Sequence, residues 1–194
     1  MSITKKYPTV SACGLDCVLC PRYYTEGRSR CAGCGSEYSP AVIGCKIFRC
    51  CVKEKGLGTC AECRDFPCPK YELVDATDSF VTHRKMLANL RSIRAFGIEA
   101  FLEEQEERRI LLKGMLDEYN DGRSKSFLCV AATLLPVLSL KDSMKDAERR
   151  SSEDGIGDGD RAGKAAMLRS SLNEAASREN VDLGLRKASP KKRN

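Results

Sequence analysis

The stretch CGLDCVLCP, Cys13 to Pro21, places three cysteines at spacings of three and then two intervening residues. Cysteine thiolates are ligands for zinc and for iron-sulfur clusters, so this stretch decides how the first third of the chain folds. Its spacing allows two interpretations. Either the thiols hold a cluster that carries out chemistry, or they hold a metal that only stabilises the chain.

Cysteine is concentrated around this stretch. The chain has 194 residues and 12 cysteines, which is far above ordinary usage. Eleven of them lie within the first 68 positions: Cys13, Cys17, Cys20, Cys31, Cys34, Cys45, Cys50, Cys51, Cys60, Cys63 and Cys68. An odd number of clustered cysteines, two of them adjacent, fits a disulfide framework poorly. We therefore expect metal ligands.

Three Cys-x-x-Cys knuckles organise this cluster: Cys17 with Cys20, Cys31 with Cys34, and Cys60 with Cys63. A tetrahedral metal needs four donors, and one knuckle supplies two of them from a single tight turn. The first two knuckles are ten residues apart and predict a first metal site by themselves. The third knuckle predicts a second site.

The second site needs two more donors. The candidates nearest to Cys60 and Cys63 are Cys45, Cys50 and Cys68, while Cys13 either replaces a ligand of the first site or serves the second. The cluster contains no histidine, so the predicted sites are all-thiolate, which suits both zinc and iron-sulfur clusters. The paired knuckles favour zinc, and an iron-sulfur cluster in a redox or electron-transfer protein is the alternative.

The opening motif also has the spacing of the cluster loop in radical S-adenosylmethionine enzymes. Such an enzyme surrounds its cluster with alternating strands and helices, whereas this motif is followed by more cysteines and then by a helical period. We therefore reject radical chemistry. The sequence also has no Ser-His-Asp set, Walker loop or dinucleotide fingerprint, so we expect a structural, accessory or interaction role rather than catalysis.

The cysteine-rich segment resembles an uncharacterised family, domain of unknown function 3795. The motifs CGLDCVLCPRY, CAGC, CKIFRCCVKEKG and CAECRDFPCPKYE follow in the family's order over residues 12–72. The resemblance implies ten metal-binding residues: Cys13, Cys17, Cys20, Cys31, Cys34, Cys45, Cys50, Cys60, Cys63 and Cys68. Cys51 departs from the pattern, and we treat it as a spare thiol. The family is similar to proteins common in anaerobic archaea and bacteria; it is usually supposed to bind zinc and has no established reaction.

Composition divides the chain into three parts. Residues 9–74 form a turn-rich, cysteine-rich metal-binding module with few large apolar residues, so a metal is expected to hold it together. Residues 78–150 form a helical segment that packs on the module, and residues 151–194 form a disordered or weakly helical basic tail. The predicted fold class is mostly α, with an irregular N-terminal module followed by a helical bundle.

Apolar residues recur with a helical period after the module. The pattern predicts a helix from Met86 that Gly97 caps, and a second from Ile98 to Tyr119. A third starts near Ser126 and is apolar on nearly every side, which predicts burial; Pro136 ends it, and a fresh helix starts near Ser139. In the tail, the Gly- and Asp-rich residues 151–163 predict disorder, and the residues after them predict one or two helical turns.

The start of the third predicted helix is a candidate anion site. It combines two cations and two hydroxyls at a helix N-terminus: Arg123, Ser124, Lys125 and Ser126. The alternative is an ordinary turn with a serine at the N-cap.

The overall charge, +6, is not focused into one stripe, because five positive charges lie in residues 186–193. A nucleic-acid partner bound through the knuckles and the tail is therefore a weaker interpretation than an unidentified protein partner. The N-terminus has no apolar signal segment, and the longest nearly apolar run, Phe127 to Leu138, is shorter than the ~20 residues that cross a bilayer. We expect a cytoplasmic protein without a membrane anchor.

Overall fold

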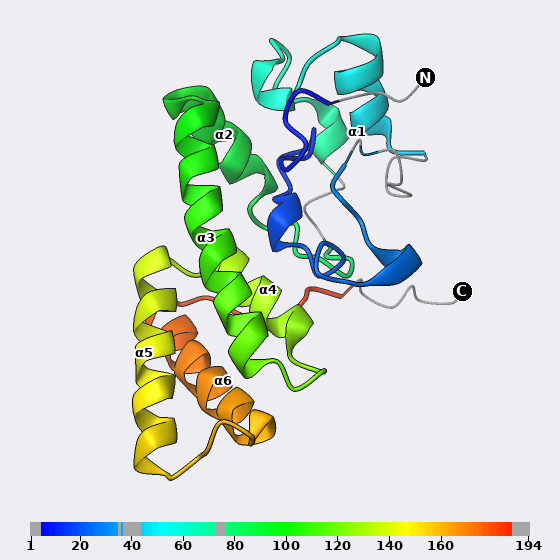
Figure 1. The fold of residues 1–194 in the computed structure, drawn as a ribbon. Coiled ribbons are helices and arrows are strands. Elements are labelled where there is room, and N and C mark those ends of the chain that lie inside the picture. Colours follow the sequence, from blue (N-terminus) through cyan, green and yellow to red (C-terminus); the bar gives the residue numbers. More distant parts are fainter. Residues whose placement is uncertain (1–4, 35, 37–43, 73–76, 188–194) are drawn as a thin grey trace, which may run out of the picture. The chain divides into compact units, whose positions relative to one another are not determined.

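The chain is mainly helical. The structure, a computed structural model, describes residues 5–34, 36, 44–72 and 77–187. Within these ranges it contains α-helices and short helical turns, and its β-structure is limited to one isolated bridge between Val10 and Asp16 (Figure 1). The predicted class, mostly α with an irregular N-terminal module, is confirmed.

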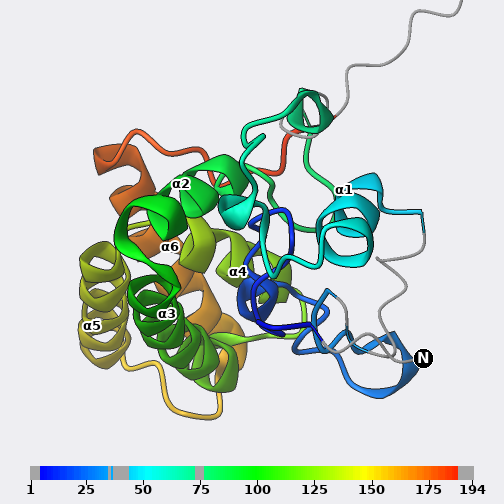
Figure 2. The ribbon, with the colours of Figure 1, turned by 90° about the horizontal axis from the view of Figure 1, so that it is seen from above.

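The cysteine-rich region is built from single helical turns. Four are 3₁₀ turns: Cys17–Leu19, Gly27–Ser29, Cys60–Glu62 and Pro69–Tyr71. The short α1 (Lys46–Phe48) continues directly into a π-helical stretch, Arg49–Glu54, drawn in cyan in Figure 2. Frequent glycine and proline keep each of these elements short.

Helices complete the core of this region. Phe48, Phe66 and Tyr71 of the module pack with Met86 and Leu90 of α2 (Met86–Phe96). Further apolar side chains of the same core come from the start of α3 (Ile98–Tyr119). The module therefore does not bury its apolar surface by itself, which agrees with its small number of large apolar residues. The helices that follow it complete the core.

The predicted boundaries of the middle helices agree closely with the structure. α2 ends at Phe96, and Gly97 follows as its C-cap with a φ of +90° that favours glycine. α4 (Lys125–Leu134) is buried on most sides, as expected. α5 (Val137–Glu153) begins directly after Pro136, two residues earlier than the predicted start, because proline is well tolerated at a helix N-cap boundary.

The tail prediction is too short. Instead of one or two turns, α6 spans Arg161–Arg178, and it packs along α5. The buried face of α6 is made of Ala165, Leu168, Leu172 and Ala175, and the facing part of α5 includes the buried Ala147. Alanine has the highest helix propensity but adds little hydrophobicity, so a pattern based on large apolar residues underestimates this helix.

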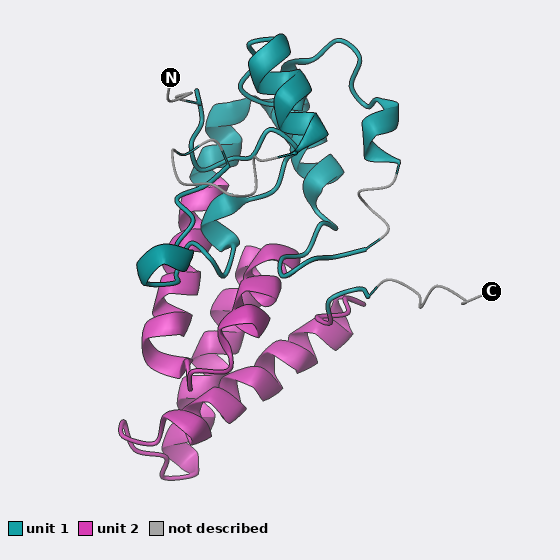
Figure 3. Cartoon of the chain, turned by 90° about the vertical axis from the view of Figure 1, so that its right-hand side faces the viewer, with its two compact units in different colours: residues 1–103, 185–194 teal, residues 104–184 magenta. Residues whose placement is uncertain are grey.

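The chain forms two compact units (Figure 3). Unit 1 consists of residues 1–103 and 185–194, and unit 2 consists of residues 104–184. This division differs from the predicted segments at 9–74, 78–150 and 151–194. The differences arise because α2 shares the core of the cysteine-rich region and because α6 packs on α5.

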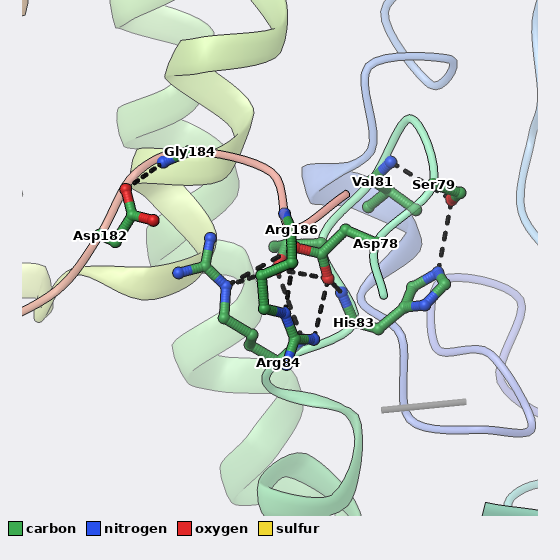
Figure 4. Close-up of polar contacts among 9 residues, drawn as sticks. Asp78, Ser79, Val81, His83, Arg84, Asp182, Gly184 and Arg186 are labelled. Atoms are coloured by element: carbon green, nitrogen blue, oxygen red, sulfur yellow. Dashed lines mark hydrogen bonds and ion pairs between the residues drawn. The ribbon is translucent and has the colours of Figure 1, made fainter. Parts of the chain in front are cut away.

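Asp78 anchors the segment that follows α6 to unit 1 (Figure 4). The side chain of Asp78 is fully buried, and it accepts hydrogen bonds from the Arg186 guanidinium at 3.0 Å and from the backbone N–H groups of Arg186 and His83 at 2.9 and 2.8 Å. Burial raises the pKa of Asp78, but the hydrogen bonds outweigh this effect and hold it well below its usual range. Of the basic tail, residues 188–194 lie outside the described ranges.

Candidate metal centre

The non-cysteine residues of CGLDC shape the first knuckle. The Asp16 side chain accepts a hydrogen bond from the Val18 N–H at 3.2 Å and so caps the turn that carries Cys17. Gly14 has a φ of +86°, and a Cβ on it would lie 2.3 Å from the carbonyl oxygen of Met86. Glycine is therefore required here both by its backbone conformation and by the close approach of α2.

The second knuckle lies against the first. The Cys34 N–H donates to the Cys17 sulfur at 3.4 Å. Gly33, inside the knuckle, has a φ of +113°, and a Cβ on it would lie 2.3 Å from the Pro8 carbonyl oxygen. The structure thus brings together two residues, Cys17 and Cys34, that were predicted to share the first site.

Six cysteines line one cavity of about 150 Å³ in unit 1. They are Cys13, Cys17, Cys20, Cys31, Cys34 and Cys45. Cys13, whose place the sequence left open, therefore lies with the first predicted site. Cys45 also lies here rather than with Cys60 and Cys63, for which it was a candidate.

The other five clustered cysteines line a second, smaller cavity of about 60 Å³. They are Cys50, Cys51, Cys60, Cys63 and Cys68. Cys50 and Cys68 thus lie with the third knuckle, as the sequence suggested. Cys51, treated as a spare thiol, also lines this cavity. The sequence did not predict this position for Cys51. Cys50 and Cys51 lie in a π-helical stretch, whose turn differs from that of an α-helix.

The third knuckle is positioned by α2. The Arg94 guanidinium donates to three backbone carbonyls at the knuckle and just after it: Ala61 at 3.0 Å, Cys63 at 2.5 Å and Phe66 at 3.0 Å. An arginine fork that binds three carbonyls fixes the backbone on which two thiols are mounted. This role of Arg94 could not be predicted from the sequence, because Arg94 lies 31 residues from Cys63.

Two charged side chains lie at the rim of the second cavity. The Lys55 ammonium lies 3.2 Å from the Cys63 sulfur and 2.5 Å from an Asp65 carboxylate oxygen. Both contacts, that with Asp65 first, raise the pKa of Lys55, so this side chain stays a cation beside the sulfur.

The two cavities differ in the protonation of their thiols. In the first, burial raises the pKa of Cys17 to about 12 and that of Cys34 to about 11, and it also raises the pKa of Cys13. In the second, the hydrogen bond from Cys51 lowers the pKa of Cys60 to about 7, with the Tyr71 hydroxyl also contributing. The second cavity therefore holds a thiol that ionises near neutral pH.

A buried lysine lies among the same thiols. Lys5 is 4% exposed, and its ammonium nitrogen has no hydrogen-bond partner in the part of the chain that the structure describes. Burial lowers the pKa of Lys5, and the nearby thiols of Cys34, Cys17 and Cys13 in the first cavity and of Cys51 in the second partly offset this by raising it. A buried unpaired ammonium is costly, and a negatively charged group among these sulfurs would offset that cost.

The donor chemistry fits a thiophilic metal, although the sulfurs do not yet converge on one point. Across the described ranges, no three His, Cys, Asp or Glu side chains lie close enough together to hold a single ion. The cysteines that line each cavity come from separate turns of the chain. Eleven thiols, no histidine and one unpaired ammonium together suit zinc or an iron-sulfur cluster.

The contacts at the candidate anion site favour its alternative. An Asp121 carboxylate oxygen accepts the N–H groups of Arg123 and Ser124 at 3.0 and 2.9 Å. The Ser124 side chain is buried, and its hydroxyl accepts a hydrogen bond from Arg169 at 3.4 Å. A carboxylate of the chain itself supplies negative charge at this helix start, and Ser124 occupies the N-cap position, although its side chain makes no capping hydrogen bond there.

No helix in the described part of the chain is both long enough and apolar enough to cross a membrane.

Comparison with known proteins bears on the cysteine-rich region alone. Residues 9–73 match the model of a family described as "Protein of unknown function (DUF3795)". Neither the curated proteins nor the solved structures gave a match to the chain. The matched residues contain all eleven clustered cysteines. They also include every residue that lines the second cavity, and every residue that lines the first except Phe80 and Val81. Over this segment, the chain is similar to the DUF3795 family of proteins of unknown function.

Proposed function

We propose that the chain is a zinc-binding protein in which two all-thiolate sites hold an irregular module together, in a structural, accessory or interaction role. One observation carries the proposal: each of the eleven clustered cysteines lines one of two cavities, six in the first and five in the second. Free cysteines that serve only as small apolar residues have no reason to sort in this way.

The knuckles supply the ligands of each proposed site. Cys17, Cys20, Cys31 and Cys34 form the first set, and Cys60 and Cys63 with Cys50 and Cys68 form the second. Zinc with four thiolates has no open coordination position, which supports a structural rather than a catalytic role. Each ion would link turns that are far apart in the sequence, and such links stabilise a region with little regular structure.

An iron-sulfur cluster with a redox role is the second candidate, and the size of the first cavity favours it. That cavity has about 150 Å³, against about 60 Å³ for the second. Six thiols surround it without three of them converging in the described ranges. A cluster occupies more space than one ion and accepts thiolates that are set further apart.

The state of the cysteines supports a reducing location. None of the twelve cysteines, all of which lie in the described part of the chain, is shown in a disulfide. Closely spaced free thiols persist in the cytoplasm, where disulfides are rare, so we place the protein there. The partner proposed for an accessory role is another protein, with nucleic acid as the weaker alternative.

Metal analysis of protein purified without oxygen tests the proposal. We expect a colourless protein with about two zinc ions per chain, one for each cavity. The variants Cys31→Ser/Cys34→Ser and Cys60→Ser/Cys63→Ser should each lose one ion. A brown protein that contains iron and sulfide would contradict the zinc assignment and support an iron-sulfur cluster. A protein that binds neither metal, even after anaerobic reconstitution, would refute both candidates.

A further inference from the structure

The N-terminal segment that carries Lys5 runs between the two cavities. On one side, the Pro8 carbonyl oxygen lies so close to Gly33, in the second knuckle, that a Cβ added to Gly33 would be only 2.3 Å from it. On the other side, a Cβ added to Gly58, just before the third knuckle, would be only 2.8 Å from the Tyr7 ring. Residues 7 and 8 are thus held by the loops that carry ligands of both cavities.

Lys5 lies at the start of this segment as a buried cation. It is 4% exposed, while its neighbour Lys6 is exposed and lies over the Tyr7 ring. No described residue accepts a hydrogen bond from the Lys5 ammonium. Burial lowers the pKa of Lys5, while nearby thiols of both cavities raise it, namely Cys34, Cys17 and Cys13 of the first and Cys51 of the second.

Neutral thiols cannot offset a buried positive charge, but metal-bound thiolates can. A divalent zinc ion with four thiolates carries a net charge of about −2, and burial makes this charge costly unless a cation lies nearby. The cost of burying the ammonium and the cost of burying the anionic site offset each other when both are present.

We propose that the Lys5 ammonium is the built-in countercharge for the zinc-thiolate groups of the two cavities. This inference rests on the proposed function. It assigns to Lys5 a positioning role in which the residue acts through charge and does not ligate the metal. Residues outside a ligand set commonly change metal affinity by 10- to 100-fold.

Zinc titration of the full chain, in competition with a chromophoric chelator, tests the inference. We expect Lys5→Met to weaken zinc affinity by ~10-fold or more, because methionine keeps the apolar stem and removes the charge. The matched control is Lys6→Met, which removes an exposed charge one residue away and should leave the affinity unchanged. Equal affinities for Lys5→Met and wild type would refute the inference while leaving the zinc proposal standing.

Urea unfolding of the metal-free protein supplies the second measurement. If Lys5 acts through charge, metal-free Lys5→Met should be at least as stable as wild type, because a buried unpaired ammonium has been removed. A variant that is less stable without metal and also binds zinc more weakly would show that Lys5 only packs, and this would overturn the inference. Wild-type protein that binds no zinc would overturn both the zinc proposal and the role of Lys5.

Discussion

Cys51 and Cys60 show how a neighbouring thiol changes the chemistry of a cysteine. The hydrogen bond between them lowers the pKa of Cys60 and raises that of Cys51, so one thiol is stabilised as the anion and the other as the protonated donor. The sequence predicts that Cys60 is a metal ligand, because Cys60 belongs to a Cys-x-x-Cys knuckle, and it predicts no such role for Cys51. Their pairing depends on a nine-residue separation being closed by the fold.

Replacing both cysteines of the third knuckle is the most direct test of their assignment as metal ligands. We expect Cys60→Ser/Cys63→Ser to lose metal from the second cavity and to become sensitive to protease in the cysteine-rich region, because structural zinc supplies on the order of 10 kcal/mol. Metal analysis and limited proteolysis measure both effects. Cys129→Ala is the matched control, since Cys129 is buried in α4, outside both cavities. Native metal content in the double variant would contradict the assignment.

The pKa values predict the order in which the cavities fill. Protons compete with metal for a thiol whose pKa is raised, so binding to Cys17 and Cys34 must displace protons at neutral pH, whereas protons compete less at Cys60, whose pKa the neighbouring Cys51 lowers. At pH 7 and one equivalent of zinc, we expect the second cavity to fill first, and its preference to decrease as the pH rises.

Alkylation of the unprotected cysteines followed by mass spectrometry measures this order. At one equivalent of zinc, Cys60 and Cys63 should be protected while Cys31 and Cys34 react. Protection of the first cavity before the second would contradict the prediction.

At the scale of elements, α2 has a function that its amphipathic pattern does not reveal. Its apolar face, including Leu90, completes the core, and Gly14 allows close approach of the first knuckle. The polar end of the same helix carries Arg94, which binds the carbonyls of the third knuckle. A single helix thus orients backbone segments that belong to both cavities.

Replacement of Arg94 tests this coupling. We expect Arg94→Gln to weaken zinc binding at the second cavity by ~10-fold, because three carbonyls lose their donor and the knuckle becomes less ordered. Site-resolved alkylation protection during a zinc titration gives the measurement. Arg91→Gln, an exposed arginine on the same helix, is the control. Equal affinity in both variants would show that the Arg94 contacts do not support the site.

At the scale of the whole molecule, the chain after α6 returns to unit 1, and Asp78 fixes it there. The Asp78 side chain is buried and bound by Arg186, although the two residues are 108 positions apart. Composition placed Arg186 in a basic tail without a function. Its contact explains why unit 1 includes residues from both ends of the chain.

Asp78→Asn should destabilise unit 1 by about 3 kcal/mol at neutral pH, because the charged hydrogen bonds between the buried Asp78 carboxylate and the partly exposed Arg186 are lost. The pKa of Asp78 is lowered in the folded state, so its contribution is present above the unfolded pKa of about 4 and is lost as the pH falls further. The difference in unfolding free energy between wild type and variant should therefore shrink below pH 4. A difference that does not change with pH would argue against a charge effect.

The sequence by itself determined the clustering of the cysteines into knuckles, the mostly α fold class and the ends of α2 and α3, because residue spacing, helical period and glycine caps are local properties. Only the tertiary structure decided that Cys13 and Cys45 line the first cavity, that Cys51 lines the second, and that Lys5 is buried. It also revealed the length of α6, whose small residues pack against α5. These features depend on which distant segments meet, and residue spacing along the chain does not encode that.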